Sequence, residues 1–167
     1  PKADAIFRPE MRVFLFLCII FEIPLAIVSP NLNLRTMDLT FSTPLKGNLV
    51  LCSDYRDAAL HRSPGLYKFV WVRRGCLWLE VDHIPMELRA GMLLPLTPLH
   101  TLDVTRAEGE YLILAFDSNF YCIFGHDGEV SCSGLLFNGS SEVLRLELSE
   151  VRTAALQRVV DDLRAEY

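Results

Sequence analysis

Three side chains between residues 61 and 100 carry groups that could hold a metal ion or a ligand: His61, Lys68 and His100. An imidazole is a common metal ligand, but a catalytic zinc site needs three protein ligands and this set supplies only two. A protonated lysine has no lone pair to donate, and its positive charge repels a divalent cation. The set therefore argues against metal-dependent catalysis, and we predict no metal, no cofactor and no enzymatic activity.

Metal-ligating residue types also gather between residues 122 and 132. They are Cys122, His126, Asp127, Glu129 and Cys132. The Cys-x3-His-x5-Cys spacing matches no common zinc geometry, and the apolar residues between these positions favour packing over ligation. We therefore predict no metal centre in this segment.

The composition restricts the class of protein and the kinds of partner. Apolar residues make up 51% of the 167 residues, which predicts one folded domain rather than a disordered chain. The net charge is −5, from 16 basic and 21 acidic residues. Nucleic-acid binding needs a clustered basic surface, so we expect none by this chain alone. The five cysteines include no CxxC pair, which predicts free, mostly buried thiols.

Residues 1–30 form an apolar N-terminal extension. The run from Val13 to Val28 is almost wholly apolar and is interrupted by Glu22 and Pro24. It is shorter than the roughly 20 apolar residues of a membrane-spanning helix and carries a carboxylate near its centre. The alternatives are a signal-peptide-like segment and a buried strand or helix. We predict a cytoplasmic protein, and export or membrane anchoring through residues 11–28 stays open.

The stretch from Tyr67 to Phe116 has the pattern of several strands. Apolar and polar residues alternate over 77–82 and over 101–105, which is the period of a strand with one buried face. Turn signals separate the runs at 82–85, at Gly91 and at 107–109. Four or five short strands at this spacing predict an all-β sandwich or barrel. Further strands are predicted at 48–53 and 142–148.

Residues 149–167 have the clearest helical pattern. Ser149 is a good N-cap residue, and an apolar stripe recurs at a spacing of four residues. One edge of this broad stripe could pack on the strands while the other meets a partner helix, or the whole stripe could pack on one surface. We predict a C-terminal dimerisation helix and a homodimer. The candidate interface residues are Leu156, Val159, Val160, Leu163 and Tyr167.

The spacing around His61 resembles the first motif of metal-binding cupins. That motif is His-x-His, four residues, Glu, six residues and Gly, and this chain has His61-x-Ser63, four residues, Lys68, six residues and Gly75. The segment from Gly91 to His100 resembles a shortened second cupin motif, in which a Gly-led turn containing Pro ends in His. The spacing of the first motif is kept, but Ser63 replaces one histidine and Lys68 replaces the glutamate.

This resemblance implies a mainly β fold: a cupin-like (double-stranded β-helix or jelly-roll) barrel over residues 31–148, followed by the amphipathic helix. If position 68 faces the barrel interior, alternation places Val70 and Val72 inside and Phe69 and Trp71 outside. The implied cavity suits a small organic ligand with an acidic or hydroxyl group. The candidate ligand-binding residues are His61, Lys68, Val70, Val72, His100 and Leu102. The alternative is that the polar groups are hydrogen-bonded or exposed at the mouth.

Residues 120–137 resemble the segment that follows the barrel in AraC-type bacterial transcription regulators. Its recurring features are Phe120-Tyr121-Cys122-Ile123, His126-Asp127, Glu129-Val130-Ser131-Cys132 and Gly134-Leu135-Leu136-Phe137. Residues 34–38 and the helix from Ser149 fit the same pattern, so the resemblance covers residues from about 32 to 167. It implies a ligand-sensing and dimerisation module that contacts DNA only through an attached pair of helix-turn-helix units. The alternative is a stand-alone cupin-type enzyme or sugar-binding protein, exported if residues 11–30 are a signal.

Overall fold

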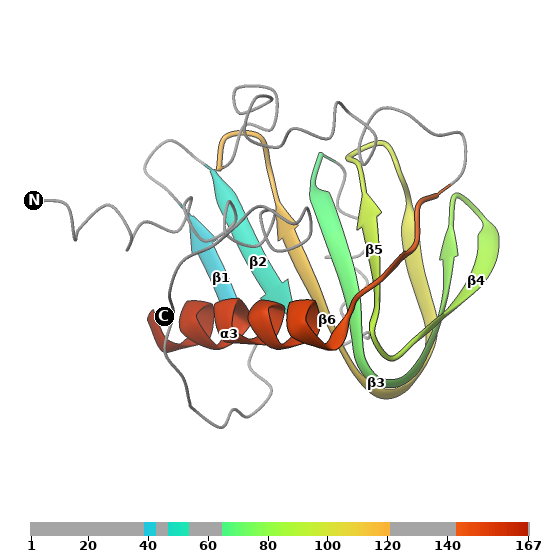
Figure 1. The fold of residues 1–167 in the computed structure, drawn as a ribbon. Coiled ribbons are helices and arrows are strands. Elements are labelled where there is room, and N and C mark those ends of the chain that lie inside the picture. Colours follow the sequence, from blue (N-terminus) through green and yellow to red (C-terminus); the bar gives the residue numbers. More distant parts are fainter. Residues whose placement is uncertain (1–38, 43–46, 54–64, 121–142, 167) are drawn as a thin grey trace, which may run out of the picture.

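The computed structural model of the chain describes residues 39–42, 47–53, 65–120 and 143–166. Over these residues the protein is mainly β, with one antiparallel sheet and one C-terminal helix (Figure 1). The elements are β1 (Leu39–Ser42), β2 (Asn48–Cys52), β3 (Tyr67–Val81), β4 (Ile84–Arg89), β5 (Met92–Leu96), β6 (Leu102–Phe116), β7 (Leu146–Glu147) and α3 (Glu150–Glu166). The sheet order is β1-β2-β6-β3-β5-β7, and β4 pairs with β3.

The predicted N-terminal extension, residues 1–30, lies outside the described residues. Within the part of the chain that the structure describes, no helix combines the length and the apolar character that crossing a membrane requires.

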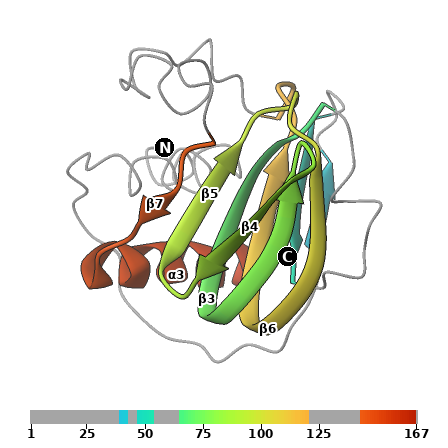
Figure 2. The same ribbon diagram turned by 90° about the vertical axis from the view of Figure 1, so that its right-hand side faces the viewer.

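Two long strands, rather than several short ones, form the centre of the sheet. β3 and β6 each contain 15 residues, and they pair from Tyr67 opposite Phe116 to Val81 opposite Leu102. The sequence pattern predicted a strand break over 107–109, and this prediction was wrong. At those positions the two strands bend together without ending, so that the sheet folds over itself (Figures 1 and 2).

The bend is made by two glycines that face each other in the ladder. Gly75 has φ +77 and Gly109 has φ +118, which is the region that favours glycine. A Cβ at Gly75 would overlap with the carbonyl oxygen of Glu108, and one at Gly109 would overlap with that of Arg74. The two backbones therefore approach too closely for any other residue.

Two bulges keep the apolar residues of the bent strands on the same face. The first shift in register lies in β3, between Val72 and Arg74. The second lies in β6, between Arg106, which pairs with Trp78, and Val104, which pairs with Leu79. A one-residue insertion reverses the side-chain alternation. The inward positions of β3 accordingly change from even numbers before the bulge to odd numbers after it.

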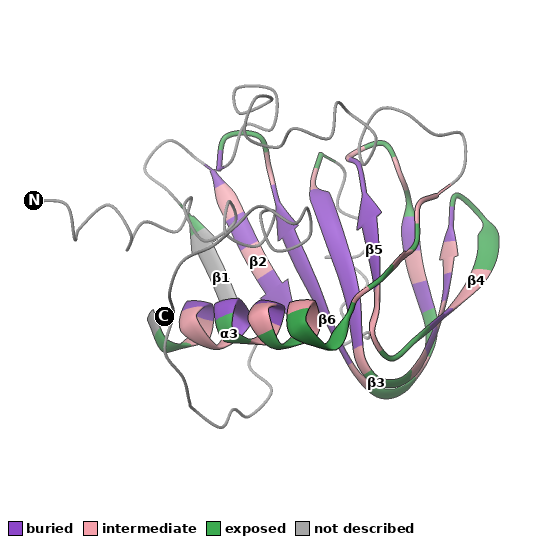
Figure 3. Cartoon of the chain, in the orientation of Figure 1, coloured by how far each residue is buried: buried purple, intermediate pink, exposed green. Residues whose placement is uncertain are grey.

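The folded sheet encloses an inner core. Its side chains come from both arms of the bend, and the burial pattern is drawn in Figure 3. They are Val70, Val72, Leu77, Leu79, Val81, Leu88, Leu94, Leu96, Leu102, Val104, Tyr111 and Ile113. Apolar burial of this kind is the main stabilising contribution to the fold.

A second, outer core lies between the other face of the sheet and α3. It includes Phe69 and Trp71 of β3, and Leu156 and Leu163 of α3. The predicted side-chain directions along β3 are therefore confirmed, because Val70 and Val72 lie in the inner core. The helix thus covers the outward-facing aromatic residues of β3.

Turn and cap chemistry fix the ends of the elements. Asp82 and His83 have φ 51 and 67, and they form the two-residue connection between β3 and β4. Pro85 was predicted in this turn but belongs to β4, which pairs with β3 alone and so tolerates a residue without an N–H. Ser149 caps α3 as predicted, with its Oγ accepting from the Arg152 N–H at 3.4 Å.

We predict that Gly75→Ala destabilises the fold much more than Gly65→Ala. Gly65 has a comparable φ of +83, but a Cβ there meets no atom within 4 Å. Gly65→Ala should therefore cost about 1–2 kcal/mol, the cost of the left-handed backbone alone. Gly75→Ala adds the overlap with Glu108 and should cost about 3 kcal/mol or more. Urea unfolding of both variants measures the difference, and equal losses would contradict the proposed close approach.

Candidate functional site

Lys68 is the most unusual residue of the predicted ligand site. It lies at the start of β3, between Leu96 of β5 and Ala115 of β6, and is 1% exposed. Its Nζ donates to the carbonyl oxygen of Leu66 at 3.4 Å. Desolvation by burial lowers the pKa of the Lys68 ammonium from its ordinary value. A lysine this deeply buried is rare, and such a perturbed group marks a candidate functional site.

His100 is held in one orientation by the loop between β5 and β6. Its Nδ1 accepts from the Thr97 backbone N–H at 3.1 Å and lies 2.8 Å from the Thr97 Oγ1. Because the backbone N–H can only donate, Nδ1 must be unprotonated and the neutral ring carries its proton on Nε2. The half-buried His100 can therefore donate one hydrogen bond to a ligand through Nε2–H.

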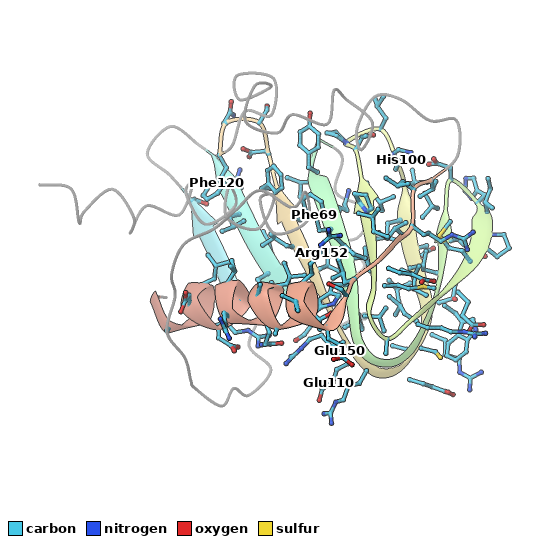
Figure 4. All side chains as sticks on the ribbon, in the orientation of Figure 1. Phe69, His100, Glu110, Phe120, Glu150 and Arg152 are labelled. Atoms are coloured by element: carbon cyan, nitrogen blue, oxygen red, sulfur yellow. The ribbon has the colours of Figure 1, made fainter. Side chains whose placement is uncertain are left out.

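Lys68 and His100 lie at the same end of the folded sheet. Lys68 pairs with Leu96, the last residue of β5, and the next residue, Thr97, holds the His100 ring. Figure 4 shows His100 at the end of the sheet away from Glu110, which lies at the bend. This end therefore presents an ammonium and an imidazole N–H beside an apolar interior.

The other predicted ligand residues fall into two groups. Val70, Val72 and Leu102 are at most 1% exposed and pack in the inner core, so their contribution is shape and an apolar environment. His61 lies outside the described residues, as does the segment from Cys122 to Cys132. Among the described residues no cluster of three or more His, Cys, Asp or Glu side chains could hold a metal ion.

The predicted dimer-interface residues of α3 are occupied within their own chain. Leu156, Val159, Val160 and Leu163 are at most 6% exposed and pack in the outer core. These side chains cover the large residues on the outer face of the sheet. The four residues therefore pack within their own chain, and their assignment to a dimer interface stays a prediction. Tyr167 lies outside the described residues.

A groove that the sequence analysis missed runs between α3 and the bend of the sheet, with a volume of about 920 Å³. It is lined by Trp71, Arg73, Arg74, Glu110, Tyr111, Leu112, Leu148, Glu150, Thr153, Gln157, Asp161 and Arg164, among others. These residues come from distant parts of the chain, and the helical ones have the mixed polarity of an ordinary solvated face. The groove residues of α3 recur every three or four positions, and this spacing was the only feature of the sequence that indicated a shared surface.

Comparison of the chain with protein-family models and with curated proteins found no match. The likeness to cupins and to AraC-type regulators therefore depends on the residue pattern given above. The described fold supports the coarser statement, a mainly β architecture with one antiparallel sheet and a C-terminal helix.

We predict that Lys68→Met removes a pH-dependent contribution to the stability of the protein, because the variant has no buried ammonium that can titrate. The folded pKa of Lys68 lies below the ordinary 10.5, so the unfolded chain binds more protons between the two values. Wild-type stability should therefore rise with pH across that window, and this contribution should vanish in the variant.

Urea unfolding at a series of pH values measures this effect. Arg89→Met is the matched control, because the Arg89 side chain is 72% exposed. Parallel pH curves for the wild type and Lys68→Met would contradict the burial of a titrating ammonium.

We also predict that Leu163→Ala lowers stability by about 2–5 kcal/mol, the usual cost of a cavity in a core. Val151→Ala, at the 80% exposed Val151 of the same helix, should change stability by no more than about 0.5 kcal/mol. Chemical unfolding measures both, and sedimentation velocity follows self-association. If Leu163→Ala dissociated a dimer without a loss of stability, the packing described here would be refuted.

Proposed function

We propose that this chain is a ligand-binding regulatory domain built on a cupin-like barrel, rather than an enzyme. More specifically, it is the ligand-sensing and dimerisation module of an AraC-type transcription regulator, active in the cytoplasm. The observation that carries the proposal is Lys68, a buried ammonium at the end of an apolar interior. Ligand pockets typically combine an apolar lining with a few placed polar groups.

The ligand we propose is a small organic acid. Its carboxylate would accept hydrogen bonds from the Lys68 ammonium and from the His100 Nε2–H, while its body meets the apolar interior. An opposite charge beside Lys68 would favour the charged lysine and offset the cost of its burial. This differential stabilisation gives the ligand a means of shifting a conformational equilibrium.

The two faces of β3 support a route for the signal. Lys68 and Val70 face the inner side, while Phe69 and Trp71 face α3 on the other side of the same strand. A shift of β3 around a ligand would therefore alter the surface against which the helix packs. In an AraC-type regulator this would change the arrangement presented to the DNA-binding half.

The proposed homodimer would use the outward side of α3, because the inward stripe is buried. Val151, Ala154, Arg158 and Ala165 are exposed and recur at helical spacing. Val151→Asp should then weaken self-association with little change in stability. Sedimentation velocity across a concentration series tests this part of the proposal, and an unchanged association constant would remove the outward side of α3 from the interface.

We predict that at least one small carboxylic acid raises the melting temperature of this chain, while its uncharged primary amide does not. A ligand at a hundred times its dissociation constant stabilises the folded state by about 2.7 kcal/mol, which is several degrees for a domain of this size. Lys68→Met should abolish the shift, and Arg89→Met should preserve it. Scanning fluorimetry against a panel of acids and matched amides provides the measurement.

Two results would refute the proposal. An equal shift in Lys68→Met would remove Lys68 from the site, and stoichiometric iron, zinc or manganese bound through His61 and His100 would favour the cupin-type enzyme. The coding sequence beyond residue 167 tests the AraC assignment independently, since two helix-turn-helix units are expected there.

A further inference from the structure

The groove between α3 and the bend is separate from the interior near Lys68. Its walls are the side of α3 that carries Glu150, Gln157 and Arg164, and the outer surface of β3 and β6 around Trp71 and Glu110. Figure 4 shows Glu110 and Glu150 close to the first turn of α3. A volume of about 920 Å³ is at the upper end for a site that takes a small organic molecule.

Trp71 lines this groove and carries a buried hydrogen-bond donor that has no partner among the described residues. The side chain is 2% exposed, and its Nε1–H has no acceptor among the described residues. The strand register fixes its position, because Trp71 pairs with Leu93 on one side and Leu112 on the other. Buried indole N–H groups usually have a partner, so this one is suited to an acceptor atom of a ligand.

The groove is lined by three arginines and by three carboxylates, and Arg73 is the arginine that lies at the Trp71 ring. The Arg74 guanidinium forms an ion pair with Glu110, and Arg73 Nη1 lies 3.8 Å from the same carboxylate. The hydrogen bond from Arg74 lowers the pKa of Glu110, and the charges of Arg73 and Arg164 act in the same direction. The charges of three guanidinium groups thus act on one carboxylate. Glu150 and Asp161 also line the groove, and Asp161 accepts a hydrogen bond from Gln157 at 2.7 Å.

Arg73 is the guanidinium best placed to bind an added anion. Its carboxylate contact is long, and Glu110 is already paired with Arg74. The Arg73 Cζ lies 5.9 Å from the centre of the Trp71 ring, so the guanidinium and the indole adjoin. A guanidinium and a neutral N–H in one partly buried place can together bind the oxygen atoms of an anion.

We propose that this groove binds a small organic oxyanion, with its carboxylate or phosphate head on Arg73 and the Trp71 Nε1–H. The body of the ligand would lie against Leu112 and Leu148, which line the same groove. Such a ligand contacts both α3 and the bend, so it fastens the helix to the sheet. The site uses neither Lys68 nor His100 and stands independently of the sensing function proposed above.

The test uses the indole N–H resonance of Trp71 in the whole chain. The sequence has two tryptophans, so Trp78→Phe leaves Trp71 as the only indole. Benzoate and phenyl phosphate are the two anionic probes, and benzamide is the neutral control. We expect at least one anion to shift the Trp71 indole resonance saturably, and benzamide to leave it in place. The two anions distinguish a carboxylate from a phosphate head.

Arg73→Met should weaken binding of the effective anion by about tenfold or more, the effect of losing one charge-assisted hydrogen bond. Arg106→Met is the matched control, because Arg106 lies over the Trp78 ring at 4.7 Å and does not line the groove. It should leave the affinity unchanged, as should Lys68→Met. Urea unfolding confirms that each variant is folded.

An indole resonance that neither anion moves would overturn the proposal. Equal losses in Arg73→Met and Arg106→Met would also overturn it, since the binding would then reflect overall charge. A loss in Lys68→Met alone would assign the anion to the interior site and remove it from the groove.

Discussion

The described fold depends on the close approach of Gly75 in β3 and Gly109 in β6. The two residues face each other in the ladder, both have positive φ, and neither has room for a Cβ. Pairing continues through this point, so the two 15-residue strands bend as a unit. The bend closes one face of the sheet on itself and leaves the other face open. That open face is the surface on which α3 packs.

The strand β3 connects the two cores and both candidate sites. Its inward residues, beginning with Lys68, contribute to the interior, and its outward residues, Phe69 and Trp71, pack under α3. The bulge after Val72 shifts this alternation by one residue, so that Leu77 and Leu79 still face inward beyond the bend.

The two candidate sites differ in the polar groups that they place next to apolar side chains. Lys68 is an ammonium inside the fold, where desolvation lowers its pKa. Beside the groove, the charges of three guanidinium groups act on Glu110, and the indole N–H of Trp71 has no acceptor among the described residues. Each arrangement places N–H donors in a partly apolar setting, which is the physical basis for expecting anionic ligands at each.

The start of α3 could be predicted from the sequence, because Ser149 followed by an apolar stripe reflects the geometry of a single helix. The opposite directions of Val70 and Trp71 in β3 followed from the resemblance to cupins, which implied that position 68 faces inward. The same patterns could not show that β3 and β6 are continuous, since each bulge interrupts the alternation and mimics a strand end. They also could not identify the surface that Leu156 and Leu163 cover, because apolar burial has no directional preference between its own sheet and a partner. Only the tertiary structure decided this, and only it brought Trp71, Arg73 and Arg164 together at one groove.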